Sequence, residues 1–129
     1  MSKGYDKHRE RLEAVNALGR GLTRRSSSKC ELCGGSGVKL SVVEIEPLPA
    51  QPDPDHTVFV CDTCRDGMTG GKLDADRWRF LETVIWSEIP VVQVAAVRVT
   101  RKLQEQGAQW AIDLLDNMYL SPEVEEWVK

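Results

Sequence analysis

The stretches Cys30-Glu31-Leu32-Cys33 and Cys61-Asp62-Thr63-Cys64 hold all four cysteines of this chain, in two matched pairs separated by residues 34–60. Two residues between the cysteines of a pair let one tight turn present both thiolates to an ion, and two such turns supply a tetrahedral zinc site. Gly34 and Gly35 follow the first pair, where we expect a positive φ and backbone N–H groups close to a thiolate. The spacing therefore predicts one structural Zn²⁺, because four thiolates leave no open position for water or substrate; its ligands are Cys30, Cys33, Cys61 and Cys64.

Two other uses of four cysteines are a pair of disulfides and a redox dithiol of the thioredoxin kind. The chain begins Met1-Ser2-Lys3-Gly4-Tyr5-Asp6, without the apolar run of a secretion signal, and no stretch is apolar and long enough to span a bilayer. Because disulfides are rare in reducing compartments, a metal site is favoured over bridges. We expect a soluble cytoplasmic protein with no membrane partner.

The length of 129 residues fits one domain, or a small metal module joined to a helical part. The charged and hydrophobic fractions, 29% and 41%, are those of a globular protein and exclude global disorder. Residues 1–29 carry eight Lys or Arg against three Asp or Glu, a charge of +5, and the remainder carries nine against seventeen, a charge of −8. The N-terminal segment is therefore basic.

A basic segment beside a zinc module suggests a nucleic-acid partner, because phosphate contacts from Lys and Arg dominate non-specific affinity. The residues concerned are Arg20, Arg24, Arg25 and Lys29. A solvated helix face that pairs with the acidic remainder of the chain is the simpler interpretation. It is favoured because no aromatic residue lies between the arginines to stack on bases.

Apolar spacing predicts an amphipathic helix over residues 5–19 and a loop over 23–29. Residues 38–45 are rich in β-branched side chains and predict a strand, which several prolines then end. A second short strand is expected over 56–60, so that it delivers Cys61 at its end. The metal module is thus predicted to be a hairpin with a long proline-rich connection, stabilised largely by its ion.

The C-terminal half is predicted to be helical. Asp74 or Asp76 is expected to cap a helix that reaches residue 85, and Pro90 to begin a helix over 90–103, although the density of valine keeps a strand as the alternative. Gly107 ends that helix. A further helix is expected over 111–118, and a terminal helix is expected to follow Ser121 as its N-cap. The four tryptophans of this half are assigned to the core: Trp78, Trp86, Trp110 and Trp127.

These elements define an α+β fold that is mostly α. A small β module of the zinc-ribbon or treble-clef kind, residues 30–66, follows a basic N-terminal helix and linker, residues 1–29. Residues 74–129 form a helical region that we expect to pack on the module as one compact unit.

Several motifs together resemble the PhnA-like proteins that carry an N-terminal zinc ribbon. The likeness runs from about Leu18 to Trp127, and its most diagnostic segment is Trp86-Ser87-Glu88-Ile89-Pro90. It implies that the four cysteines are zinc ligands and that the family's small β-rich C-terminal domain is missing after Lys129. The family is named after phosphonate-utilisation genes, but no residue set here is suited to cleaving a carbon–phosphorus bond. The other motifs are Leu18-Gly19-Arg20, Arg24-Arg25, Ser28 to Cys33, Val60 to Cys64, Trp78 to Leu81, Ile85 to Val94, Trp110-Ala111, Leu114-Leu115 and Tyr119-Leu120.

An HNH-type nuclease is the enzyme alternative, since it also uses two such cysteine pairs as a scaffold. It needs histidines near the end of the first strand, where the chain has Val43 to Leu48, and His56 comes later and alone. A second, oxygen-rich metal site is a further hypothesis, but a solvated acidic loop is favoured over it. The members of such a metal site would be Glu44, Glu46, Asp53, Asp55 and His56. Glu31 and Asp62, inside the cysteine pairs, are expected to face solvent.

The sequence thus predicts a cytoplasmic zinc protein that acts as a binding or regulatory module rather than as a catalyst. A protein partner would use an apolar helical face around Trp86 or Trp127. A nucleic-acid partner would use the basic residues of the N-terminal segment.

Overall fold

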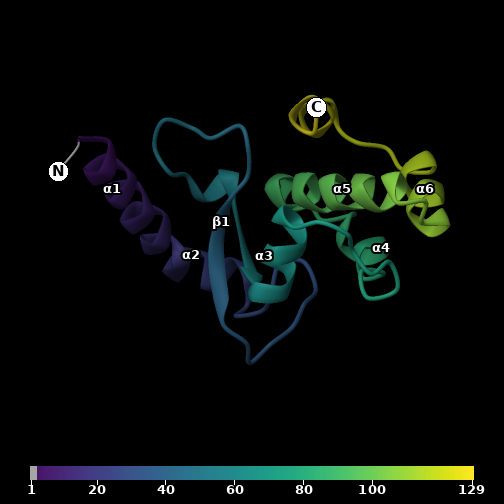
Figure 1. The fold of residues 1–129 in the computed structure, drawn as a ribbon, viewed down its shortest axis with the longest axis horizontal. Helices are drawn as coiled ribbons and strands as arrows, with labels where there is room; N and C mark the ends of the chain where they lie inside the picture. Colours follow the sequence, from purple (N-terminus) through teal and green to yellow (C-terminus); the bar gives the residue numbers. More distant parts are fainter. Residues whose placement is uncertain (1–2) are drawn as a thin grey trace.

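A computed structural model describes residues 3–129, with side chains from residue 7 onwards. It is an α+β structure with a single two-stranded antiparallel sheet among mostly helical elements, as predicted (Figure 1). Residues 1 and 2, part of the first of the three predicted segments, lie outside the described residues, and that division of the chain stays a prediction. Among residues 3–129, no helix has both the length and the apolar character needed to cross a bilayer.

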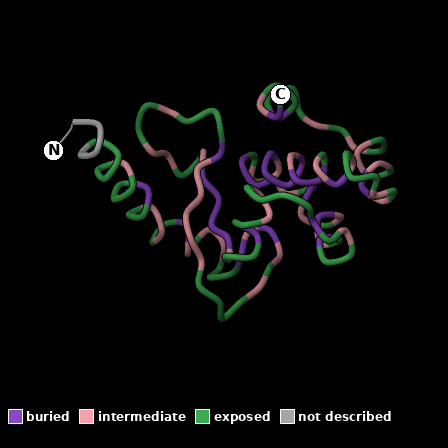
Figure 2. Tube along the Cα trace, in the orientation of Figure 1, coloured by how far each residue is buried: buried purple, intermediate pink, exposed green. Residues whose placement is uncertain are grey.

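Two helices stand where one helix and a loop were predicted. Helix α1 covers Lys3–Ala17, and after a break at Leu18 helix α2 covers Gly19–Ser26. The predicted loop over 23–29 is therefore wrong in its first half. Helix α2 continues because Leu22 is buried, and a Cβ on Gly19 would lie 3.9 Å from side chains of the sheet. Helix α1, by contrast, projects from the body and is largely exposed (Figures 1 and 2).

The hairpin forms where the β-branched runs predict it. Strand β1, Leu40–Glu44, pairs antiparallel with β2, Thr57–Cys61, in a register that sets Leu40 opposite Cys61 and Glu44 opposite Thr57. The first four residues of β2 are buried, whereas β1 is half-buried throughout. The connection carries the prolines and ends in the 3₁₀ turn η1, Pro54–His56. Strand β2 is thus the inner strand of the module.

Helix α3, Asp62–Thr69, was not expected from the sequence. Glycines at 67, 70 and 71 indicate a turn, yet the helix begins directly after Cys61, which is extended, and runs to Thr69. A Cβ on Gly67 would overlap the indole of Trp78, which lies against the helix at this point. Glycine is therefore required inside α3 by the close approach of another side chain rather than by a turn.

The predicted helix from residue 74 to residue 85 is mostly wrong. Only α4, Leu81–Val84, is helical, and the preceding residues form successive turns. The Asp74 carboxylate accepts a hydrogen bond from the N–H of Asp76 at 3.0 Å. Such a local bond competes with helix formation, which is why Asp favours turns. Trp78 is nevertheless buried, with 6% of its surface exposed.

Helix α5, Pro90–Glu105, is the central element, and the strand alternative for its valine-rich sequence is wrong. Proline stands at its first turn, where the missing N–H costs nothing. Nine of its residues are buried, because the module packs on one side and α4, α6 and α7 contact it elsewhere (Figure 2). Its polar side chains form a narrow stripe that includes Arg98, Arg101 and Glu105, so most of the helix surface is apolar and enclosed.

Two short helices complete the chain. Gly107, with φ of 88°, ends α5, and α6 then covers Gln109–Asp116. Helix α7, Pro122–Trp127, begins at the predicted cap, where Ser121 Oγ accepts a hydrogen bond from Val124 N at 3.3 Å.

One apolar cluster contains buried residues of the cysteine module, of α5 and of the C-terminal end, from Cys30 and Leu32 to Val124 and Val128. The prediction that all four tryptophans are core residues is wrong for Trp86, which is 51% exposed. Trp110 and Trp127 are half-buried. The indole Nε1–H of Trp127 donates to the carbonyl of Glu46 at 2.9 Å, which ties α7 to the end of β1.

Candidate metal centre

The first cysteine pair lies in a tight turn, here called the first knuckle, residues 30–33. The N–H of Gly34 donates to the carbonyl of Cys30, and the N–H of Cys30 donates to the carbonyl of Gly35, both at 2.9 Å. Gly34 has a φ of 76°, the left-handed conformation expected for this position. A Cβ on Gly35 would approach Cys33 Sγ to 3.4 Å. The two glycines therefore serve the turn and the close approach to sulfur that the sequence indicates.

The second pair, residues 61–64, lies at a junction rather than in a hairpin turn. Cys61 is the last residue of β2, and Cys64 is in the first turn of α3. The free N–H groups and the dipole at a helix N-terminus favour negative charge there. Helix α3 is thus part of the centre, and the sequence pattern did not reveal it.

The structure brings the four predicted ligands together. Their Sγ atoms all lie within 4.8 Å of one another, and those of Cys33 and Cys61 are 3.8 Å apart. Bonds of about 2.3 Å to a tetrahedral zinc require sulfurs about 3.8 Å apart, so the sulfur set fits a four-thiolate metal site. Cys30 and Cys64 are buried and the other two are more exposed. All four are free thiols rather than members of the alternative disulfides.

Without a metal, the electrostatics of the cluster favour a thiolate at Cys30 and protonated thiols at Cys33 and Cys64. The hydrogen bond from the Cys64 thiol, followed by N–H groups from Cys61, Cys33 and Leu32, lowers the pKa of Cys30 to about 4. The same hydrogen bond between the two sulfurs raises the pKa of Cys64, and burial raises the pKa of Cys33. Four thiolates so close together repel one another, and a divalent cation between them removes that repulsion. The cluster is therefore suited to hold a metal ion.

Glu31 is buried instead of facing solvent, which corrects the prediction. Its side chain is 3% exposed and forms an ion pair with Arg25, whose Nε and Nη2 donate to the two carboxylate oxygens at 2.8 and 2.6 Å. Oε1 also accepts the N–H of Phe59 at 2.7 Å. Arg25 donates further to the carbonyls of Pro54 and Thr57, at 2.9 Å each. Asp62 is exposed as expected.

This Arg25–Glu31 pair links α2, the first knuckle and β2, so it positions the backbone that carries Cys30 and Cys33. Sequence reasoning missed it. The sequence offers one signal for this ion pair, a basic residue six positions before an acidic residue that lies inside a cysteine pair. That spacing alone does not identify an ion pair, because side chains six positions apart meet only where the chain folds back on itself.

The alternative second metal site does not form. Within the described side chains, the four cysteines are the one group of three or more metal-ligating residues close enough to share an ion. Glu44 forms an ion pair with Arg11 at 2.7 Å, and Asp53 caps η1 by accepting the N–H of Asp55 at 2.8 Å. The carboxylates of the loop between the strands are thus separated, each with its own partner or in solvent.

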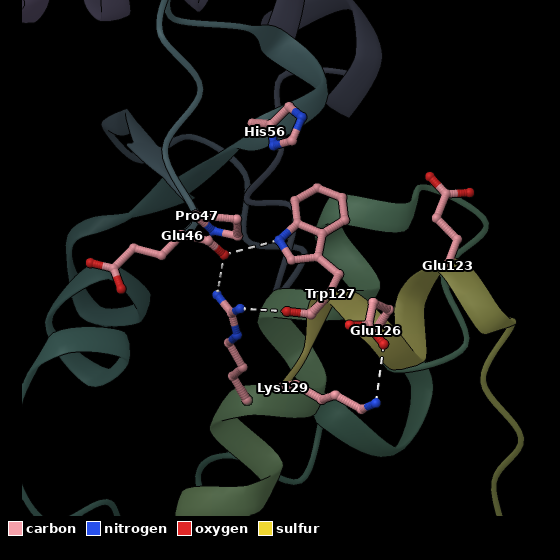
Figure 3. A pocket seen from close by; sticks show the side chains of 8 residues that line it. Glu46, Pro47, His56, Glu123, Glu126, Trp127 and Lys129 are labelled. Atoms are coloured by element: carbon pink, nitrogen blue, oxygen red, sulfur yellow. Dashed lines mark hydrogen bonds and ion pairs between the residues drawn. The ribbon is translucent and has the colours of Figure 1, made fainter.

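His56, the candidate base of the nuclease alternative, lies against Trp127 with ring centroids 4.8 Å apart. It lines an open pocket of about 700 Å³ together with carboxylates of α7 (Figure 3). Arg98, which also lines the pocket, donates to the carbonyls of Glu46 and Trp127, at 2.7 and 2.8 Å, and burial lowers its pKa. The side chains described around His56 include no group of three that would share an ion.

The basic residues proposed for nucleic acid divide into two sets. Arg20, Arg24 and Lys29 are exposed, whereas Arg25 is directed inward to Glu31 and to two carbonyls, and is not available to a partner. The prediction is therefore wrong for Arg25. Comparison of the chain with protein-family models, with curated proteins and with solved structures found no match, so the PhnA-like resemblance stays a prediction.

Proposed function

We propose that this chain is a cytoplasmic PhnA-like protein whose four cysteines bind one structural Zn²⁺, and that it acts as a non-catalytic binding or regulatory module. The observation that carries the proposal is the closed set of four sulfurs, all within 4.8 Å of one another. Thiolates select soft or borderline ions, and four of them in this geometry favour zinc. A fourth sulfur in place of an open position favours a structural role over a catalytic one.

The position of the cluster supports a structural role. The first knuckle, β2 and α3 converge on it, and two of its cysteines belong to the apolar core. A sheet of two strands buries too little surface to be stable by itself. An ion that only the folded chain can coordinate adds its binding free energy to folding, so removal of the ion is expected to unfold the module.

The metal proposal is tested by elemental analysis of the purified chain and by substitution of Co²⁺. We expect one zinc per chain and a cobalt spectrum typical of tetrahedral sulfur ligands. Cys64→Ser is expected to lose the ion, whereas Thr63→Ser, an exposed neighbour that is not a ligand, should keep it. A metal-free protein with an unchanged fold, or a cobalt site with an exchangeable water ligand, would contradict the proposal.

The partner of the module is proposed to be a protein that contacts an exposed aromatic face. Trp86 has 51% of its surface exposed, whereas Trp127 is half-buried and already bonded through its indole N–H. Aromatic side chains exposed in this way are enriched at interfaces. Retention of cytosolic proteins by the immobilised chain, compared between the wild type and Trp86→Gln, tests this site; identical profiles would argue against it.

Magnesium- or manganese-dependent nicking of plasmid that is lost in His56→Ala would favour the nuclease alternative instead. Glu125→Gln, an exposed α7 variant that does not line the His56 pocket, serves as its control.

A further inference from the structure

The segment of residues 14–43 exposes charged side chains that are all cationic once the chain is folded. Between residues 14 and 43 the sequence contains five Lys or Arg and a single acidic residue, Glu31. The structure buries Glu31 and pairs it with Arg25. The four remaining cations, here called the cationic strip, are all exposed: Arg20, Arg24, Lys29 and Lys39.

The four residues lie along α2 and the loop that leads into β1 (Figure 1). Arg20 and Arg24 are four positions apart on α2, so they are neighbours on one face of the helix, opposite the buried Leu22. Lys29 forms an isolated antiparallel bridge with Ser36, and Lys39 follows three residues later. Along the chain, the strip therefore runs from the helix past the first knuckle to the residue before β1.

Among the side chains that the structure describes, these cations have no acidic partner. The ion pairs among the side chains of residues 7–129 involve Arg11, Arg25, Arg65, Arg79 and Lys129, and none involves a residue of the strip. A solvated face that pairs with the acidic remainder, the simpler interpretation from sequence, predicts such pairs. Four exposed cations without such a pair, in a segment whose one carboxylate is buried and bonded to Arg25, instead favour a positively charged surface on a chain of net charge −3.

We infer that the cationic strip binds the phosphate backbone of a nucleic acid without reading its sequence. Charge complementarity to a polyanion is the first argument. The second is that exposed serines lie between the cations along the chain, so that their hydroxyls are accessible as phosphate donors: Ser27, Ser28 and Ser36. The strip contains no aromatic residue to stack on bases, so we assign it to backbone contact alone.

An anionic membrane is the competing polyanion, and the apolar residues argue against it. A helix that lies on a bilayer needs an exposed apolar face. Leu22, the one large apolar side chain of α2, has 1% of its surface exposed and is turned to the sheet. Val38 is the one large apolar side chain exposed between residues 14 and 43. The strip is thus suited to phosphate and not to insertion.

The inference rests on the proposed zinc-stabilised module, because Lys29 directly precedes the first knuckle and Lys39 follows it. It is tested by fluorescence anisotropy of a labelled short DNA duplex and of a single-stranded RNA with the metal-loaded full chain. With about four phosphate contacts, affinity for the duplex is expected to fall about 100-fold between about 50 and about 200 mM salt. No binding to either probe at the lower salt concentration overturns the inference.

Two matched double variants locate the contact. Arg20→Gln/Arg24→Gln removes two cations from the strip and should reduce the salt-dependent loss to about 10-fold. Lys72→Gln/Arg77→Gln removes the same charge from exposed residues outside the strip and should leave the loss unchanged. An equal effect of both variants would mean that net charge, and not the strip, determines binding. Lys39→Gln alone is expected to lower the slope of log affinity against log salt by about 0.9.

Vesicles of phosphatidylserine and phosphatidylcholine complete the test. Binding to the vesicles that is as tight as binding to the nucleic acids would overturn the inference in favour of a membrane surface. Zinc content is measured for each variant, so the two proposals fail separately. Loss of nucleic-acid binding with one zinc retained supports the strip, whereas a wild-type chain that binds nucleic acid but contains no zinc contradicts the proposed structural ion and leaves the strip in place.

Discussion

Replacement of Arg25 by Met is the most informative single perturbation of this fold. The guanidinium fills a position between α2, the first knuckle and β2, and makes four hydrogen bonds there. Methionine keeps much of the length and the helix propensity of arginine but has no donor. Among the described residues, the variant therefore leaves Glu31, whose side chain is 3% exposed, with the Phe59 N–H as its one remaining partner.

The expected cost follows from that unpaired charge. Removing one partner of a buried ion pair costs about 3–5 kcal/mol, because the other charge stays desolvated. Two carbonyl oxygens, those of Pro54 and Thr57, also lose a donor. At about 4 °C per kcal/mol for a chain of this size, the unfolding midpoint should fall by about 10–20 °C. Because the pair supports the first knuckle, we also expect metal affinity to fall about 10- to 100-fold.

Denaturant unfolding followed by circular dichroism, at a fixed concentration of free zinc, measures the free-energy change. Arg24→Met is the matched control, since Arg24 is the adjacent, exposed residue of the same helix, and it should change stability by no more than about 0.5 kcal/mol. The double variant Arg25→Met/Glu31→Leu, which removes both charges, should be more stable than Arg25→Met. Equal midpoints for Arg25→Met and Arg24→Met would refute the reasoning.

Three further predictions concern packing and metal release. Gly67→Ala should destabilise the chain by about 1–3 kcal/mol, because the new methyl group overlaps Trp78, whereas Gly71→Ala, in open space, should be close to neutral; thermal melts compare the two. Trp127→Phe removes the hydrogen bond to the Glu46 carbonyl and should cost about 1 kcal/mol in the same measurement, and an unchanged midpoint would mean that the bond contributes nothing. Zinc should be released as the pH falls, because protons compete with the metal for the thiolates; a chromogenic chelator follows the release, and full retention of zinc in strong acid would contradict a four-thiolate site.

Local sequence signals correctly predicted the features that depend on neighbouring residues or on a regular spacing of side chains. The cysteine spacing identified the four metal-ligand candidates, and the β-branched runs located both strands. Pro90, Gly107 and Ser121 marked helix ends correctly because each acts on its own backbone, through a missing donor, a positive φ or a capping oxygen. These features need no partner from elsewhere in the chain.

The errors have one common physical cause. Helix α3, the continuation of α2 to Ser26 and the burial of Glu31 all depend on contacts between residues that are distant in the chain or brought together by folding. The sequence by itself determined which side chains can hold a metal and where the chain turns. The tertiary structure alone decided which charges are neutralised and which stay exposed, because desolvation and pairing depend on the distances between side chains, and a one-dimensional pattern does not contain those distances.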